Sequence, residues 1–330
     1  MPDETTVLSF YSQPLLYGIV LPAVTATAVL LLTWQPWHRD LPPERTAWGV
    51  GLALAAGYLV GHVGVDGCPP WPPREAVDRP WYLTFAAAAL SLLDGWRRCP
   101  AWLRWLLRTA LWLSAVWVLA RPALRQGGGA VPALLVPAAT GLLFWAALAA
   151  LARRLPGAAL PTALLPTAAG SAVLLYRCHS ARLAQLAGVV AASLLPVLAR
   201  SCVRPALTIG TAPVVLLLPG LWLTARLYAY TTPPAASLAL LAAAALAAAV
   251  ACLPGVRRLP AWQRNLLAAA LAVLLAILAV VQVRRDDNAD TFEGTAACHT
   301  RLALAVMART TDIMGQSRHH AFGERWTCHP

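Results

Sequence analysis

The sequence contains no lysine, and charged residues make up only 12% of its 330 positions. Soluble domains carry about a quarter charged residues, which help to cover the apolar core that they bury. This chain is 59% hydrophobic and has too little charge to form such a surface. The composition excludes an ordinary soluble protein and predicts a membrane protein, in agreement with a mean hydropathy of +0.61.

The sequence also lacks the short motifs by which common enzyme and cofactor sites are recognised. It has no glycine-rich phosphate-binding loop, no His-Glu-x-x-His and no Gly-x-Ser-x-Gly. Its seven cysteines are scattered and form no Cys-x-x-Cys pair. We therefore expect no catalytic residue, no cofactor and no metal site.

The formal net charge of +12 comes entirely from arginine. The arginines do not form one basic patch, as they do in nucleic-acid-binding proteins, but occur in twos and threes between apolar segments. In a polytopic membrane protein the charged residues are found in the loops between spans, beside the lipid headgroups. We expect the lipid bilayer as the partner of this chain and no nucleic acid, and leave protein partners and homo-oligomers open.

Apolar segments are abundant, and many have the length of about 20 residues that an α-helix needs to cross a hydrocarbon core of about 30 Å. The predicted fold class is therefore all-α, a polytopic transmembrane helical bundle of about ten spans. The third span is short for a full crossing. The predicted spans are Leu15–Trp34, Trp48–Val65, Trp81–Leu93, Ala101–Ala120, Val131–Leu151, Ala158–Leu175, Leu183–Leu198, Ala206–Leu223, Ala235–Leu253 and Leu266–Val283.

The chain divides into a predicted membrane domain, residues 1–283, and a polar C-terminal tail, residues 284–330. With ten spans, twelve arginines lie beside one face of the membrane and nine beside the other. The positive-inside rule then places both termini on the non-cytoplasmic side. We expect a multi-pass protein of a bacterial-type cytoplasmic (inner) membrane.

Two stretches, Gly95–Leu111 and Gly255–Leu271, are identical at eleven of seventeen positions, with a constant offset of 160 residues. Both stretches place arginines before a helix, proline in its first turn and tryptophan at the interface, and this shared task alone can explain the similarity. The alternative is a parallel duplication of a four-helix unit, with copies at residues 15–120 and 183–283.

The second predicted span has a small residue about every four positions between Gly49 and Gly64. This spacing lets neighbouring helices approach closely, so we expect the span to be central in the bundle and not lipid-facing.

The same span carries Tyr58, His62 and Asp66, one helical turn apart on one face. Ionisable residues inside a membrane are candidate functional residues because their burial is costly. Together with Arg108 of the fourth span, these residues form the candidate intramembrane polar site. The alternatives are an interfacial His62–Asp66 pair without a function and an Arg108 side chain that snorkels to the headgroups.

The polar tail holds two cysteines, Cys298 and Cys328. In a non-cytoplasmic, oxidising compartment the thiols of small polar segments tend to pair, so we hypothesise a Cys298–Cys328 disulfide. Free thiols in a cytoplasmic tail, and a metal site that uses His299, His319 or His320, are the alternatives. The spacing of these residues does not support the metal site.

The leading functional hypothesis is an accessory or structural membrane protein without a sequence-visible active site. A transporter or permease for a small solute is the alternative, because broken helices bind substrate in carriers and prolines interrupt several spans: Pro137, Pro161, Pro166, Pro213 and Pro219. A membrane-embedded enzyme that acts on lipids is the second alternative. A polar cavity near the midplane would favour the transporter, and a packed bundle the accessory role.

Overall fold

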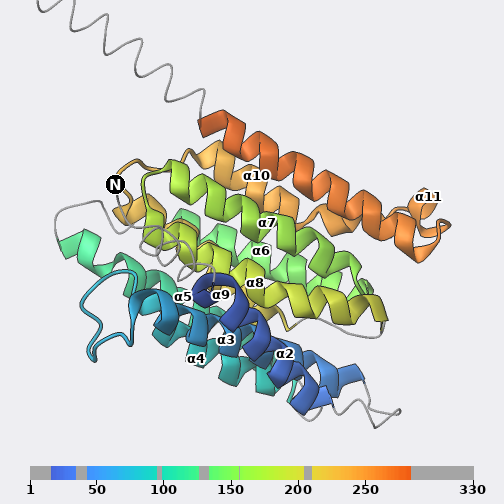
Figure 1. The fold of residues 1–330 in the computed structure, drawn as a ribbon, viewed down its shortest axis with the longest axis horizontal. Helices are drawn as coiled ribbons and strands as arrows, with labels where there is room; N and C mark the ends of the chain where they lie inside the picture. The colour runs from blue at the N-terminus through green and yellow to red at the C-terminus, as the bar shows by residue number, and fades with distance from the viewer. Residues whose placement is uncertain are drawn as a thin grey trace, which may run out of the picture. The chain divides into compact units, whose positions relative to one another are not determined.

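The computed structural model describes residues 16–34, 43–94, 99–125, 134–155, 157–203 and 210–283 (Figure 1). All regular secondary structure within these ranges is helical. Nine helices of this described part are long and apolar enough to cross a membrane. The predicted all-α class is therefore confirmed, and the helices are those of a multi-pass membrane protein.

Each of the ten predicted spans coincides with a helix, although the ends differ by several residues. The helices in chain order are η1 (Leu16–Val20), which continues as α2 (Leu21–Trp34), α3 (Pro43–Asp66), α4 (Arg79–Asp94), α5 (Ala101–Arg125), α6 (Leu135–Arg154), α7 (Ala159–Arg177), α8 (Ala181–Val203), α9 (Thr211–Tyr228), α10 (Ala235–Ala245), η3 (Ala247–Cys252), α11 (Pro254–Arg257) and a last helix, Ala261–Val283.

Helix α4 corresponds to the short third span and is not among the nine candidate spans. It has 16 residues, which at 1.5 Å per residue give a length of about 24 Å. The indole of Trp81 at its start donates to the carbonyl of Leu59 towards the end of α3 (3.4 Å), so the two helices run antiparallel. Near its end, Ser91 lies against Gly51, close to the start of α3.

Five prolines were the reason to expect interrupted spans, and all five lie inside continuous helices. Three of them occupy the third position of a helix, where the amide has no acceptor within the helix and proline costs no hydrogen bond. These three are Pro137 in α6, Pro161 in α7 and Pro213 in α9. A substrate site between half-helices would require a broken helix, and the backbone of these spans is continuous.

Helix α9 is the most enclosed of the candidate spans. Its fifteen residues from Thr211 to Ala225 are all buried, and it packs against each of the helices α3 to α8. A helix that is apolar on all sides can face either lipid or protein. Here protein surrounds it, so the centre of the bundle is filled by side chains.

The small residues of α3 lie where its neighbours come closest. A Cβ atom at Gly57 would be 2.9 Å from the carbonyl oxygen of Pro22 in α2 and 2.5 Å from the hydroxyl of Ser193 in α8. A Cβ atom at Gly61 would meet Pro22 and Val189 in the same way. The predicted close approach of neighbouring helices is confirmed, since α2, α4 and α8 all pack against the glycines of α3.

The two similar stretches begin a helix at the same point. α5 starts at Ala101 and the last helix at Ala261, and in each the arginine three residues later donates its N–H to the preceding proline carbonyl, at 3.2 Å in both cases. The surroundings differ, because α4 packs against α3 and α9 whereas α10 packs against α7. Duplication of a four-helix unit stays a prediction.

We predict that Gly57→Ala lowers the stability of the protein by about 1–3 kcal/mol, the usual cost of overpacking, because a backbone carbonyl cannot move aside. The matched control is Gly188→Ala in α8, where a Cβ atom would meet nothing within 4 Å. The control should be neutral or slightly stabilising, since alanine favours a helix more than glycine does. Unfolding in detergent micelles measures both, and equal effects would contradict the packing described here.

Candidate functional site

The candidate site lies at the C-terminal end of α3. The helix ends there because Gly67 adopts φ +81°, a conformation that glycine enters without strain, and donates its N–H to the Val63 carbonyl (2.9 Å). The proline-rich segment that follows cannot continue the helix. The chain turns back through residues 67–78, here called the 67–78 loop, and enters α4 at Arg79.

The 67–78 loop is held by its own polar groups and by α4. The carboxylate of Asp78 accepts the backbone N–H groups of Arg74 (3.2 Å) and Glu75 (3.0 Å). The hydroxyl of Tyr82 lies within hydrogen-bonding distance of the Pro69 and Pro70 carbonyls, at 3.1 and 2.9 Å. The loop is therefore a folded turn that covers the end of α3.

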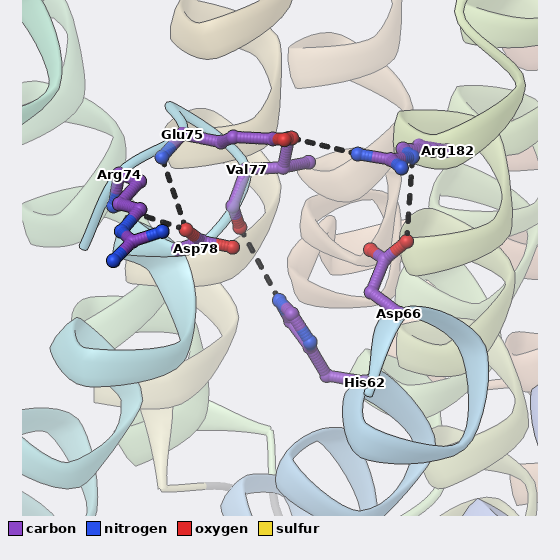
Figure 2. A network of polar contacts seen from close by, with 7 residues as sticks. All are labelled: His62, Asp66, Arg74, Glu75, Val77, Asp78 and Arg182. Atoms are coloured by element: carbon purple, nitrogen blue, oxygen red, sulfur yellow. Dashed lines mark hydrogen bonds and ion pairs between the residues drawn. The ribbon is translucent and has the colours of Figure 1, made fainter. Parts of the chain in front are cut away.

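Tyr58 and His62 are fully buried, and His62 contacts this loop. Their rings meet edge to face, with centroids 5.8 Å apart. His62 Nε2 lies 3.2 Å from the carbonyl oxygen of Val77 (Figure 2). Because a carbonyl only accepts, Nε2 carries the hydrogen, and Nδ1 of a neutral ring is then an acceptor. His62 is therefore enclosed by protein at the end of α3 that precedes the 67–78 loop.

Asp66 does not pair with His62 but with an arginine from another helix. Its Oδ1 lies 3.5 Å from Nε of Arg182, in the first turn of α8. The Nη1 of Arg182 lies 2.7 Å from the carboxylate of Glu75 in the 67–78 loop (Figure 2). Arg182 thus bridges α3, α8 and the loop.

Three polar atoms of the site are buried and have no hydrogen-bond partner among the described residues. They are the hydroxyl oxygen of Tyr58, Nδ1 of His62 and Oδ2 of Asp66. A buried polar group without a partner costs about 1–3 kcal/mol, so three of them on one helix face call for a physical explanation.

Arg108 does not join this cluster. Its guanidinium carbon lies 5.1 Å from the ring centroid of Trp105 and 5.9 Å from that of Trp145. The indole of Trp145 donates to the hydroxyl of Thr211 (3.2 Å), which starts α9. Arg108 therefore lies towards the opposite end of the bundle, and its side chain is buried against aromatic faces.

A second polar arrangement, which the sequence analysis did not find, repairs the helix at Pro122 in α5. Proline has no N–H, so the carbonyl of Val118 four residues earlier loses its helical partner. The guanidinium of Arg79, the first residue of α4, donates to that carbonyl at 2.6 Å. Pro122 could be recognised in the sequence, but the residue that compensates for it could not.

Tyr228, the last residue of α9, completes this repair. Its hydroxyl donates to the carbonyl of Leu119 (2.8 Å) and accepts the N–H of Ala123 (3.2 Å). In an unbroken helix these two groups would bond to each other, so the hydroxyl is inserted into the hydrogen-bond ladder. Helices α4, α5 and α9 are joined at this point through backbone groups that Pro122 leaves without helical partners.

The structure also shows an apolar groove of about 600 Å³ beside the site. It lies between the first helix, α3 and the start of α4. Its lining is apolar and aromatic: Tyr17, Leu21, Leu59, Val60, Val63, Gly64 and Trp81. The groove belongs to the side of the bundle and is not a polar cavity between the two similar stretches.

The chain matches no protein-family model, no curated protein and no solved structure. Its function has to be inferred from the geometry of the described residues. Within these residues no three His, Cys, Asp or Glu side chains are grouped so that they could hold a metal ion. Cys298 and Cys328 lie outside the described residues, so the disulfide stays a prediction.

We predict that Tyr228→Phe lowers the free energy of unfolding by about 1–3 kcal/mol, because it removes the partner of the Ala123 N–H and the shorter of the two hydrogen bonds to the Leu119 carbonyl. Tyr230→Phe is the matched control, since Tyr230 lies two residues away and is 93% exposed. The control should change stability by less than about 0.5 kcal/mol, as surface substitutions usually do. Unfolding by denaturant in micelles measures both, and a neutral Tyr228→Phe would show that the hydroxyl does not support α5.

Proposed function

We propose that this protein is an accessory membrane protein with a structural role, without a substrate pathway through its centre. The observation that carries the proposal is the complete burial of α9 from Thr211 to Ala225 among six other helices. A carrier binds its substrate near the midplane, where two halves of the protein separate alternately towards each side. Here the corresponding space is occupied by one continuous helix.

Hydrogen bonds between side chains support the same interpretation. α9 is linked to α6 through Thr211 and Trp145 (3.2 Å) and to α7 through Trp222 and Ser171 (2.9 Å). Indole and hydroxyl groups at such depth have no water to bond to and depend on each other. These links favour one fixed arrangement of the helices over a moving one.

The two alternatives have less support. Interrupted helices were the main reason to consider a transporter, and the prolines concerned lie in continuous helices. An enzyme that acts on lipids would need acidic, basic or metal-binding groups around one accessible cavity. Tyr58, His62 and Asp66 lie on one face of α3, but Tyr58 and His62 are fully buried.

We also propose that α4 is a crossing, which brings the number of spans to ten. The start of α4 is tied to α5 near its end, through Arg79 and Val118, and its own end lies beside Gly51 near the start of α3. α4 therefore runs antiparallel to both neighbours. Local thinning of the bilayer can accommodate a helix this short. The 67–78 loop and both termini then share the non-cytoplasmic side.

Labelling of single cysteines tests the structural role. In a variant without native cysteines, Leu217→Cys and Leu218→Cys should not react with a membrane-impermeant methanethiosulfonate reagent from either side, because both side chains are buried. Trp71→Cys is the positive control, since Trp71 is 80% exposed in the 67–78 loop. Reaction of either α9 cysteine in the folded protein would reveal a water pathway and favour the transporter.

The same method tests the number of spans. Seven crossings separate Trp71 from Leu259 if α4 spans the membrane, and six if it does not. Trp71→Cys and Leu259→Cys should therefore react from opposite sides of sealed vesicles. Reaction of both from one side would restrict the protein to nine spans.

A further inference from the structure

The apolar groove at the side of the bundle lies at the end where the 67–78 loop is. Its described lining comes from three helix ends: the start of the first helix, the last two turns of α3 and the first turn of α4. α3 packs against both of these neighbours and forms the floor of the groove, while the other two helices form its walls (Figure 1). In a membrane the groove therefore lies within the leaflet on the side of the 67–78 loop.

Close contacts hold both walls against the floor of the groove. A Cβ atom at Gly64 would be 2.8 Å from the Cβ atom of Tyr17, so the first helix lies directly against the backbone of α3 at this point. On the other side, the indole N–H of Trp81 donates to the carbonyl of Leu59 (3.4 Å). The distance of each wall from the floor is therefore fixed by contacts to the α3 backbone.

The described lining offers almost no hydrogen-bonding group to a ligand. Only the side chains of Tyr17 and Trp81 carry a polar atom there, and the N–H of Trp81 is already donated to the Leu59 carbonyl. Pockets that bind polar small molecules place several polar groups around the ligand. The occupant is therefore apolar along the groove, with a polar group only at the end where Tyr17 lies.

The groove is continuous with the apolar outer surface of the bundle. Val63 in its floor is 40% exposed. On one wall, the ring of Trp81 contacts that of the exposed Phe85, with centroids 4.6 Å apart. On the other wall, Leu21 is followed one helical turn later by the exposed Val24. The surface that meets lipid in a membrane protein thus runs into the groove without a polar boundary, and the molecules that reach the groove are those of the bilayer.

A space of about 600 Å³ in this position has to be filled. Water finds no hydrogen-bond partners between apolar walls, and an empty space would deprive the lining side chains of their dispersion contacts. The volume lies within the range of about 300–1,000 Å³ that is usual for pockets which hold a small molecule. The apolar part of the surrounding lipid molecules is the acyl chain.

We propose that the groove holds one acyl chain of a phospholipid from the leaflet on the side of the 67–78 loop. The chain lies along α3 between the first helix and α4, and its ester end lies at the level of Tyr17 and Trp81. Tyrosine and tryptophan are enriched at this depth, where the lipid changes from apolar to polar. Because the chain packs against three helices, it fixes the first helix relative to α4 and acts as a part of the fold.

Photo-crosslinking of the full-length wild-type protein provides the first test. The protein is reconstituted with a phosphatidylcholine that carries a diazirine in one acyl chain, extracted and washed in mild detergent to remove the surrounding lipid, and then irradiated. Mass spectrometry should find adducts several times more often in residues 17–21 and 59–64 than on the exposed side of the last helix, at Leu274, Ile277 and Leu278. Equal labelling of the groove and the last helix would overturn the proposal, and this comparison needs no variant.

Val63→Trp fills the groove with an indole in place of the lipid chain. Val173→Trp is the matched control, since Val173 in α7 is 48% exposed and does not line the groove. Val63→Trp should lose the excess of adducts in residues 17–21 and 59–64, and Val173→Trp should keep it. In lipid-free detergent, added phosphatidylcholine should raise the melting temperature of the wild type and of Val173→Trp by a few degrees, because a ligand of the folded state stabilises it. Val63→Trp should not respond, and an equal response of all three proteins would contradict the assignment to the groove.

A second copy of the chain is the competing occupant of the groove. In a variant without native cysteines, Val63→Cys in lipid vesicles should form no more disulfide-linked dimer on oxidation than Val173→Cys, which reports random collisions. A dimer linked mainly through residue 63 would assign the groove to an interface between subunits and overturn the lipid site. Neither measurement involves α9, so the lipid site and the accessory role can fail independently of each other.

Discussion

The bilayer interior offers no water to backbone N–H and C=O groups, so every such group has to find its partner within the protein. The fold of this chain depends on that constraint most visibly at Pro122. There the missing N–H is compensated by Arg79 from α4 and by the hydroxyl of Tyr228 from α9. Two helices far apart in the sequence are thereby fixed against a third. One proline thus determines where three helices meet.

The spans could be predicted from the sequence because a crossing needs a long apolar segment, and length and composition are visible in any sequence. The role of α3 could also be predicted, since residues such as Gly57 and Gly61 leave room for a neighbour and have little other use in a helix. The central place of α9 could not be predicted from the sequence. An apolar helix among other helices and one among lipids have the same composition, and only the contacts of α9 distinguish them.

The candidate site, too, could be predicted from the sequence only in part. The spacing of Tyr58, His62 and Asp66 placed them on one face; the structure brings Tyr58 and His62 into contact and pairs Asp66 with Arg182. Their burial could not be predicted, because it depends on how the 67–78 loop folds back and on Arg182, which arrives from α8. Arg108 was assigned to the same site because it is an arginine inside a span. Its depth was visible in the sequence, but its position relative to α3 was not, and Trp145 of α6 covers it instead.

The enclosure of α9 has a consequence for how the chain is assembled. A ribosome makes the chain from its N-terminus, so all six helices that surround α9, from α3 to α8, are complete before α9 leaves the ribosome. They cannot yet have closed their final packing, because the space that they enclose belongs to a helix still to come. During synthesis the growing bundle therefore has to stay open on one side, and the arrival of α9 is the step that closes it.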